Sequence, residues 1–290
     1  MRQFLCFGLI IATLIESAAS FALDVVKLPQ TQSELDVRFN YKNELLERAL
    51  TLTVEEYGEF EIQMIGTPMM RNRAQAALHT GTLINVYFSP ASENLNKNTI
   101  PIKIPIRRGI LSYRLLLIHQ ADIPLFAKVK TAEDLKKLTA GLQNEWITTA
   151  IMADAGFKIR RAQTYDGLFL MLENRRFHYI PRGIHEIYDE LAVRKAVAPD
   201  VVVEPNLALY MIMPTYTYVS PAEPRLARRL EAGLTKMVEN GDLEALFNRH
   251  YADDIAKAKL SGRTIIEINN PSFNDYSLLK NKKLWFTPAP

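Results

Sequence analysis

The chemistry that cysteine provides is almost absent from this sequence. The 290 residues include a single cysteine, Cys6, close to the N-terminus. The rest of the chain therefore has no disulfide, no thiolate metal site and no cysteine nucleophile. A fold without such cross-links depends on a large apolar core. A hydrophobic content of 48% in a chain of this length is enough to build that core, and we expect it to be divided over two lobes.

Charge of one sign and long apolar runs are also scarce. The formal net charge is +3, which is mildly basic and lacks the concentrated positive charge of a nucleic-acid-binding protein. After the N-terminal segment, no stretch stays apolar over the roughly 20 residues that a membrane-spanning helix needs. The composition thus argues against nucleic-acid partners and against a membrane span in the body of the chain.

The N-terminus, MRQFLCFGLIIATLIESAASFALD, is the one strongly apolar segment. Arg2 precedes the apolar run Phe4–Ile15, and Ser20-Phe21-Ala22 has small residues at the positions that signal peptidases read. This pattern predicts a secretory signal peptide over residues 1–22, so that the mature chain begins near Leu23 in the periplasm. The alternatives are an uncleaved anchor and a buried first helix.

Apolar residues in the body of the chain follow strand and helix periods in turn. From LDVVKLP onward the pattern predicts a strand, a helix (Asn43–Tyr57), a strand (FEIQMI), a helix closed by Gly81 (MRNRAQAALHTG) and a strand (TLINVYFSP). A second run of the same kind begins at TAEDLKKL, where Thr131 is a good helix N-cap. This alternation predicts parallel sheets with helical crossovers, and therefore an α/β fold.

Two segments read as passages between lobes. IPIKIPIRRGILSYRLLLI combines two prolines, a basic stretch and an apolar strand, and VVVEPNLALYMIMPTYTYVS reads as two strands leading back. Helices are predicted at Tyr165–Asn174 and Ile184–Val193 between these passages, and an amphipathic helix at Pro224–Glu239 follows them.

The order of these segments carries a resemblance to a known family. A signal peptide, an α/β run, TAEDLKKL at the start of a second run, and a late RLARRLEAGLTKMVENGDLEALFNRHY resemble bacterial extracellular solute-binding proteins of the amino-acid-binding type (family 3). IPIRRGILSYRLLLI, RFHYIPRGIHEI and GRTIIEINNP are similar to a divergent branch of that family. The resemblance covers nearly all of the mature chain.

The resemblance implies a type II periplasmic-binding-protein fold. Such a fold has two α/β lobes, two crossing strands and a ligand cleft that closes by hinge motion. On this basis lobe one takes residues 23–112, lobe two takes 113–209, and 210–290 supply the second part of lobe one and a C-terminal tail.

This chain departs from the amino-acid-binding type at both positions that hold the amino acid there. Where that type has an arginine for the ligand carboxylate, this chain has Ser92-Glu93-Asn94. Near the position of the acid that holds the ligand ammonium, it has Arg182 in RRFHYIPRG. Arg182 lies between a strand and a helix, so we expect its planar guanidinium to bind an anionic group. The alternative is a structural pair with Glu186, one helical turn further on.

The remaining candidates for ligand contact follow predicted strands in both lobes. The resemblance points in lobe two to a loop and helix start with amide, aromatic and hydroxyl side chains, namely Asn144, Trp146 and Thr148. In lobe one it points to Gln30, Ser89 and Ser92. Each has a structural alternative, because tryptophans often pack in the core and serines beside proline often only close a turn.

Metal and catalytic motifs are incomplete. His185-Glu186-Ile187-Tyr188-Asp189 resembles a helical zinc motif but lacks its second histidine, so we expect no metal. No G-x-S-x-G elbow is present, and no catalytic residue is assigned. Glu186, Asp189 and Glu190 are expected to be charges on a solvated helix face, although a carboxylate pair there would also suit a hydrolase.

The sequence therefore predicts a periplasmic solute-binding protein without a cofactor, not an enzyme. It would capture a small polar or anionic molecule in an interlobe cleft, act as a monomer and deliver the ligand to an ABC-type permease or a membrane receptor. The alternatives are an enzyme of the dehydratase or lyase type on the same scaffold, and a ligand-sensing module for a membrane receptor.

Overall fold

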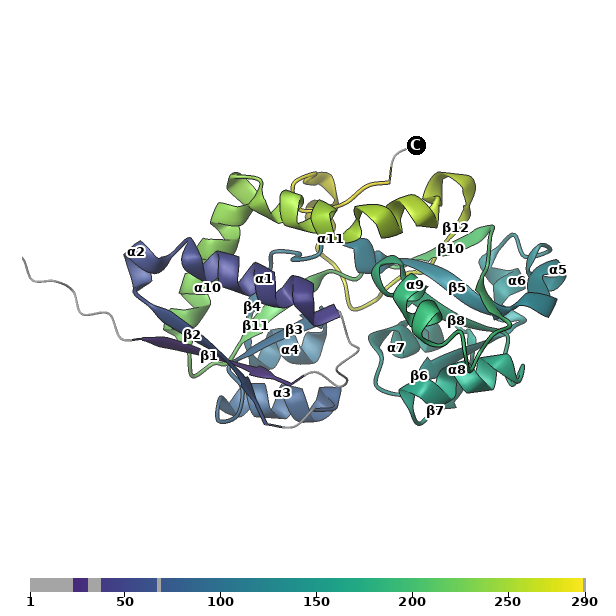
Figure 1. The fold of residues 1–290 in the computed structure, drawn as a ribbon, viewed down its shortest axis with the longest axis horizontal. Coiled ribbons are helices and arrows are strands. Elements are labelled where there is room, and N and C mark those ends of the chain that lie inside the picture. Colours follow the sequence, from purple (N-terminus) through teal and green to yellow (C-terminus); the bar gives the residue numbers. More distant parts are fainter. Residues whose placement is uncertain (1–22, 31–37, 67–68, 289–290) are drawn as a thin grey trace, which may run out of the picture.

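Two α/β lobes lie side by side in the computed structural model, which describes residues 23–30, 38–66 and 69–288 (Figure 1). The predicted signal peptide, residues 1–22, lies outside the described residues. Within the described ranges, no helix combines the length and the apolar character needed to cross a membrane.

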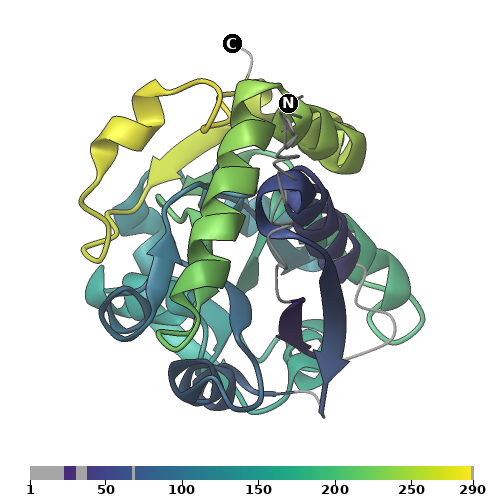
Figure 2. The same ribbon diagram turned by 90° about the vertical axis from the view of Figure 1, so that its left-hand side faces the viewer.

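Lobe one is built on two short sheets. Its strands are β1 (Asp24–Pro29), β2 (Phe60–Ile65), β3 (Val86–Pro90), β4 (Ile100–Ile102) and β11 (Thr215–Val219). Its helices are α1 (Arg38–Thr51), α2 (Val54–Tyr57), α3 (Arg71–Thr80), α4 (Glu93–Asn98) and α10 (Pro224–Glu239), and α11 (Asp242–Ala258) follows α10. In the side view, α10 lies across lobe one next to α1, on which it packs (Figure 2).

Lobe two has one seven-stranded sheet. Its strands are β5 (Tyr113–His119), β6 (Thr139–Gln143), β7 (Lys158–Ala162), β8 (Tyr179–Gly183), β9 (Val201–Val203), β10 (Leu207–Tyr210) and β12 (Thr264–Glu267). Its helices are α5 (Ile123–Phe126), α6 (Ala132–Lys136), α7 (Ile147–Asp154), α8 (Tyr165–Glu173) and α9 (Ile184–Val193). The predicted lobe boundaries remain predictions, and β12 adds a strand to this sheet from beyond residue 210.

Both lobes place their strands in the same order. In lobe two β7, β6, β8 and β5 follow one another, and β9 and β10 pair with β5. In lobe one β2 pairs with β1, and β11 lies between β3 and β4. The side chain of Asn85 joins β1 to β3, because its Oδ1 accepts from Lys27 N at 2.7 Å and its Nδ2 donates to Val25 O at 2.8 Å. The strand that enters from the other lobe, β5 or β11, is antiparallel to its neighbours in each case.

Several predicted elements are confirmed, and two are wrong. Helices α9 and α10 have the predicted bounds, and the Oγ1 of Thr131 caps α6 by accepting from Asp134 N at 3.2 Å. The helix predicted at Asn43–Tyr57 is in fact two, α1 and α2, because the hydroxyl of Thr53 donates to Leu50 O at 2.8 Å and interrupts it. The segment 201–219 holds three strands where two were predicted, since its prolines interrupt strand pairing.

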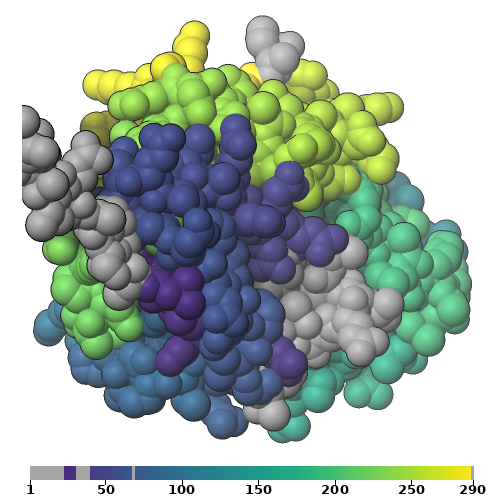
Figure 3. Space-filling model, turned by 60° about the vertical axis from the view of Figure 1, so that its left-hand side comes forward, coloured from purple at the N-terminus to yellow at the C-terminus, as the bar shows by residue number. Residues whose placement is uncertain are grey.

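The C-terminal third of the chain ties the lobes together. One cluster of buried apolar side chains runs through both lobes, from Val26 to Leu260. Helix α11 packs on α1 and on α9, and in the space-filling view the light green C-terminal helices lie over the blue lobe one and reach the teal lobe two (Figure 3). Beyond β12, Phe273 packs in lobe one, and Trp285 lies against Gly109 in the first crossing between the lobes.

Candidate ligand-binding cleft

A cavity of about 480 Å³ opens between the lobes. Gln30 and Pro90 line it at the ends of β1 and β3, and Gln143 and Arg182 line it at the ends of β6 and β8. Arg114, near the start of the crossing strand β5, lines it as well. Open α/β sheets bind ligands beyond the carboxyl ends of their strands. The cavity therefore lies where this architecture places a ligand.

The guanidinium of Arg182 is held by two acids of α9. Its Nε donates to Glu190 Oε2 at 2.6 Å and its Nη2 to Glu186 Oε2 at 2.5 Å. All three side chains are buried. Burial alone would lower the pKa of Arg182, but the carboxylates of Glu186 and Glu190 outweigh it and raise that pKa well above its usual value. The structural pair with Glu186 is thus present, and direct contact of Arg182 with a ligand stays a prediction that this pairing disfavours.

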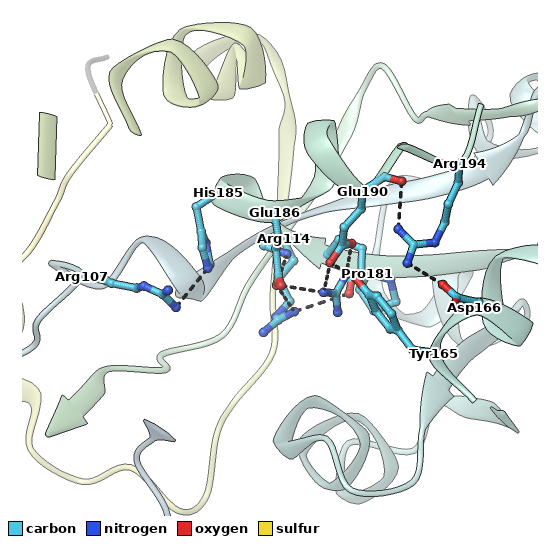
Figure 4. A network of polar contacts seen from close by, with 11 residues as sticks. Arg107, Arg114, Tyr165, Asp166, Pro181, His185, Glu186, Glu190 and Arg194 are labelled. Carbon is cyan, nitrogen blue, oxygen red and sulfur yellow. Dashed lines mark hydrogen bonds and ion pairs between the residues drawn. The ribbon is translucent and has the colours of Figure 1, made fainter. Parts of the chain in front are cut away.

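The acids of α9 are not surface charges, apart from Asp189, so that expectation was wrong for Glu186 and Glu190. Tyr165 donates its hydroxyl to Glu190, and Glu186 Oε1 accepts from Gly183 N at 3.1 Å, which caps the helix. Figure 4 shows the carboxylates of Glu186 and Glu190 converging from one helix. The polar face of α9 turns toward β8 and the cleft, and for this reason its charges are buried.

The lobe-two candidates divide between the cleft and the surface. Trp146 and Thr148 line the cavity. The Arg182 guanidinium carbon lies 4.4 Å from the centre of the Trp146 ring, a cation–π contact that holds the ring in place. Asn144 is exposed, is not among the residues that line the cavity, and accepts a hydrogen bond from Arg161.

Gln30 is the one lobe-one candidate that lines the cavity. Ser89 is buried and donates to Pro90 O at 3.0 Å. Ser92 caps α4, where its Oγ accepts from Leu95 N at 3.4 Å. These contacts match the turn chemistry that was the alternative for both serines. Their role in ligand binding stays a prediction, without support from the lining of this cavity.

No protein-family model and no curated protein sequence matches this chain. Solved structures do. A mutant of ArgBP from T. maritima has a TM-score of 0.54 at 15% identity, over 79% of this chain and 95% of its own. An ancestral amino-acid-binding protein, a precursor of cyclohexadienyl dehydratase, has a TM-score of 0.54 at 16% identity, over 79% of this chain and 95% of its own. A histidine kinase sensor domain with similarity to periplasmic binding proteins has a TM-score of 0.53 at 16% identity, over 79% of this chain and 96% of its own.

The chain has the type II periplasmic-binding-protein fold. The resemblance found in the sequence motifs is therefore confirmed at the level of the fold, and so is the α/β class. At these identities the likeness concerns the fold, so the ligand must be inferred from the residues of the cleft. About a fifth of this chain extends beyond neighbours that are themselves almost fully covered.

The fold also brings into the cleft polar residues that were not among the predicted ligand contacts. They include Arg71 at the start of α3, Glu145 in the loop before α7, Arg114 of β5 and Thr215 of β11. Arg107, in the first passage between the lobes, is buried and also lines the cavity. Because five consecutive residues of β5 are buried, its apolar run carries no alternation that would show where Arg114 points.

Away from the cleft of this binding-protein fold, His119, Glu173 and Asp200 come close enough to one another to be considered as metal ligands. The Nδ1 of His119 accepts from Ala121 N at 3.1 Å, so in the neutral ring the proton sits on Nε2. If His119 bound a metal through Nε2, that nitrogen would have to be unprotonated and Nδ1 would have to carry the proton and donate it. The group is better described as a hydrogen-bonded cluster at the edge of lobe two.

Proposed function

We propose that this protein is a periplasmic solute-binding protein, which captures a small polar solute in the interlobe cleft for transport. The observation that carries the proposal is the cavity of about 480 Å³ at the strand ends of both lobes. Small-molecule sites usually measure about 300–1,000 Å³, and this cavity has aromatic walls and a few convergent polar groups. In a two-lobe fold of this kind, the lobes close around a solute by hinge motion, and here the passages that lead into β5 and β11 lie beside the cavity.

The periplasmic location and the partner belong to the same proposal. The location is supported by the signal-peptide pattern of residues 1–22, which predicts an exported chain that begins near Leu23. An ABC-type permease is the partner we favour, because a structural neighbour is the substrate-binding protein of an amino acid ABC transporter (TM-score 0.55, 13% identity). N-terminal sequencing of protein recovered from the periplasmic fraction tests the location, and a chain that still begins at Met1 would contradict it.

Thermal unfolding of the mature protein against a panel of small solutes tests the binding function. A ligand at one hundred times its Kd stabilises the folded state by about 2.7 kcal/mol, a shift of several degrees in Tm for a chain of this size. The panel holds amino acids, carboxylates, phosphate esters and neutral sugars, and calorimetry gives the stoichiometry of each hit. A protein that no solute stabilises, and that carries none in native mass spectrometry, would not be a solute-binding protein.

Catalysis on this scaffold is the competing function, since one structural neighbour is a precursor of a dehydratase. Two of the acids that line or flank the cleft argue for binding, because Glu186 and Glu190 already accept hydrogen bonds from Arg182. We expect each solute that binds to be recovered unchanged after incubation with the protein. Conversion of a bound solute, followed by proton NMR and lost on heat denaturation, would favour the enzyme.

A further inference from the structure

Arg114 is a buried cation without a close partner. It is 3% exposed and lines the cleft. Its Nη1 lies 3.4 Å from Pro181 O and 4.0 Å from Glu186 Oε1, and its Nη2 lies 3.8 Å from Met213 Sδ. Its Nε has no hydrogen-bond partner among the described residues. Charge-assisted hydrogen bonds are about 2.7–2.9 Å long, so none of these contacts satisfies the guanidinium.

The nearby acids do not satisfy Arg114 because they serve other groups. Glu186 directs Oε2 to Arg182 at 2.5 Å and Oε1 to Gly183 N at 3.1 Å, and Glu190 also binds Arg182. Burial accordingly lowers the pKa of Arg114 to about 10, with Glu186 offsetting only part of the effect. Arg114 and Arg182 thus both line the cleft, but only Arg182 has carboxylates of the chain at hydrogen-bonding distance. Figure 4 shows Arg114 beside Glu186.

A second unsatisfied polar group lines the same cavity. Thr215, the first residue of β11, is 2% exposed, and its hydroxyl has no hydrogen-bond partner within the described part of the chain. Thr215 and Arg114 come from β11 and β5, each of which begins directly after a passage between the lobes. Buried polar groups are almost always hydrogen-bonded, so two such groups in one cavity indicate a partner that the chain does not provide.

We propose that Arg114 binds an acidic group of the solute, a carboxylate or a phosphate, and that the Thr215 hydroxyl assists it; this rests on the proposed solute-binding function. An oxyanion completes the hydrogen bonding of Arg114 and neutralises a charge that burial makes unfavourable. Arg182 does not contact the ligand directly and instead positions Trp146 through its cation–π contact. Because Arg114 lies at the start of β5, an anion bound there sits next to the hinge.

The test compares Arg114→Met with Arg182→Met and pairs each anion with a neutral analogue. The pairs are succinate with succinamide, L-glutamate with L-glutamine and glycerol 3-phosphate with glycerol, and inorganic phosphate is added. Calorimetry on the mature wild-type protein should show binding of at least one anion and weaker binding of its analogue. Arg114→Met should weaken the binding of that anion by about 10- to 100-fold, the range of one hydrogen bond to a charged group. Whether the affected anion is a carboxylate or a phosphate shows which of the two groups Arg114 recognises.

The ligand-free proteins provide a readout that needs no ligand. Arg114→Met should unfold at the same urea concentration as the wild type or at a higher one, because it removes a cation that has no close partner. Arg182→Met should unfold at a lower urea concentration, because it leaves two buried acids without their cation. If Arg114→Met is destabilised as strongly as Arg182→Met, Arg114 is a structural ion pair and the inference fails. Arg114→Lys, which keeps the charge but loses the planar fork, should keep the anion preference at reduced affinity.

Binding results separate this inference from the function on which it rests. An unchanged anion affinity in Arg114→Met would overturn the role of Arg114 and leave solute binding intact. Wild-type protein that binds only the neutral members of the pairs would overturn the ligand class in the same way. Failure of the wild type to bind any solute of this or the wider panel would overturn solute binding itself, and the anion site with it.

Discussion

Arg182 and Arg114 both line the cleft and have opposite surroundings. Arg182 donates to two carboxylates at 2.5–2.6 Å, whereas Arg114 has no contact shorter than 3.4 Å among those found for it. A buried ion pair adds little net stability, but a buried charge that loses its partner is strongly unfavourable. The same substitution should therefore have different consequences at the two positions.

Arg182→Met should lower the free energy of unfolding by about 3–5 kcal/mol, the usual effect of breaking a buried pair from one side. The reason is that Glu186 and Glu190 would both remain buried without their shared cation. Urea denaturation followed by circular dichroism measures the change. Arg161→Met serves as the control, because Arg161 is exposed on β7, and it should change stability by no more than about 0.5 kcal/mol. Equal losses in the two variants would contradict the prediction.

At the scale of the element, the contact between α10 and α1 depends on one glycine. Gly233 is buried in the middle of α10, and a Cβ there would lie 2.1 Å from Ala49 O on α1. Helix propensity alone favours alanine over glycine in a helix interior by about 1 kcal/mol. Close packing instead favours glycine here, because the atom that a Cβ would meet is a backbone oxygen, which cannot move away by rotation of a side chain.

Gly233→Ala should accordingly destabilise the protein, by about 1–3 kcal/mol as overpacked cores do. Thermal unfolding of the variant checks both the sign and the size of the effect. Gly262→Ala is the matched control, because a Cβ at that position meets nothing within 4 Å and should leave Tm nearly unchanged. A rise in Tm for Gly233→Ala would show that helix propensity outweighs packing at this contact.

The contact between α11 and α9 makes stability depend on pH. Burial, and then repulsion from Asp189 on α9, raise the pKa of Asp254 on α11 from 3.8 to about 6, while Lys257 lowers it. The folded state thus binds the proton more tightly than the unfolded state, and this carboxyl lowers stability progressively as the pH rises from 3.8 through 6.

Asp254→Asn should raise Tm at pH 7 and have little effect at pH values below 3.8, where both states are protonated. Calorimetric scans between pH 3.5 and 7.5 measure this difference. Asp253→Asn, at an exposed neighbour, is the comparison: it removes only a minor part of the repulsion that raises the pKa of Asp254 and should reproduce only a small part of the effect. A gain in Tm that stays the same across the whole range would have a cause other than the titration of Asp254.

At the scale of the whole molecule, the C-terminal segment contacts both of the lobes that the cleft separates. Strand β12 pairs with β10 in lobe two, and Phe273 packs in lobe one. Trp285 is 3% exposed against Gly109, and the amide of Phe286 donates to Arg108 O at 2.7 Å in the first crossing. A segment with contacts in both lobes and at the crossing contributes to the stability of the fold as a unit.

Trp285→Ala should reduce the free energy of unfolding by about 3–5 kcal/mol, because it empties a large buried site beside the crossing. Tyr276→Ala in the same segment is the control, since Tyr276 is 51% exposed, and its effect should stay within about 0.5 kcal/mol. Urea denaturation of both variants provides the comparison. If Trp285→Ala is as stable as the wild type, the C-terminal segment is not part of the folded core.

Local patterns in the sequence were sufficient to predict most elements and the α/β class. Helix α6 begins after Thr131 and helix α3 ends at Gly81 as predicted, because caps depend on a few neighbouring residues. The division of α1 from α2 escaped prediction, since Thr53 also accepts from Arg229, 176 residues further along the chain. Of the predicted site residues, Gln30, Trp146, Thr148 and Arg182 line the cleft, whereas Ser89, Ser92 and Asn144 do not.

The sequence by itself determined the alternation of strands and helices and the need for a core without disulfides, because periodicity, capping and composition are local properties. Tertiary structure decided which charged side chains are buried and which of them are paired. Arg182 finds its acids within eight residues, so a sequence could suggest that pair. Arg114 is surrounded by Pro181, Glu186 and Met213, which lie 67 residues or more away along the chain. Only folding determines that this guanidinium is left without a close partner.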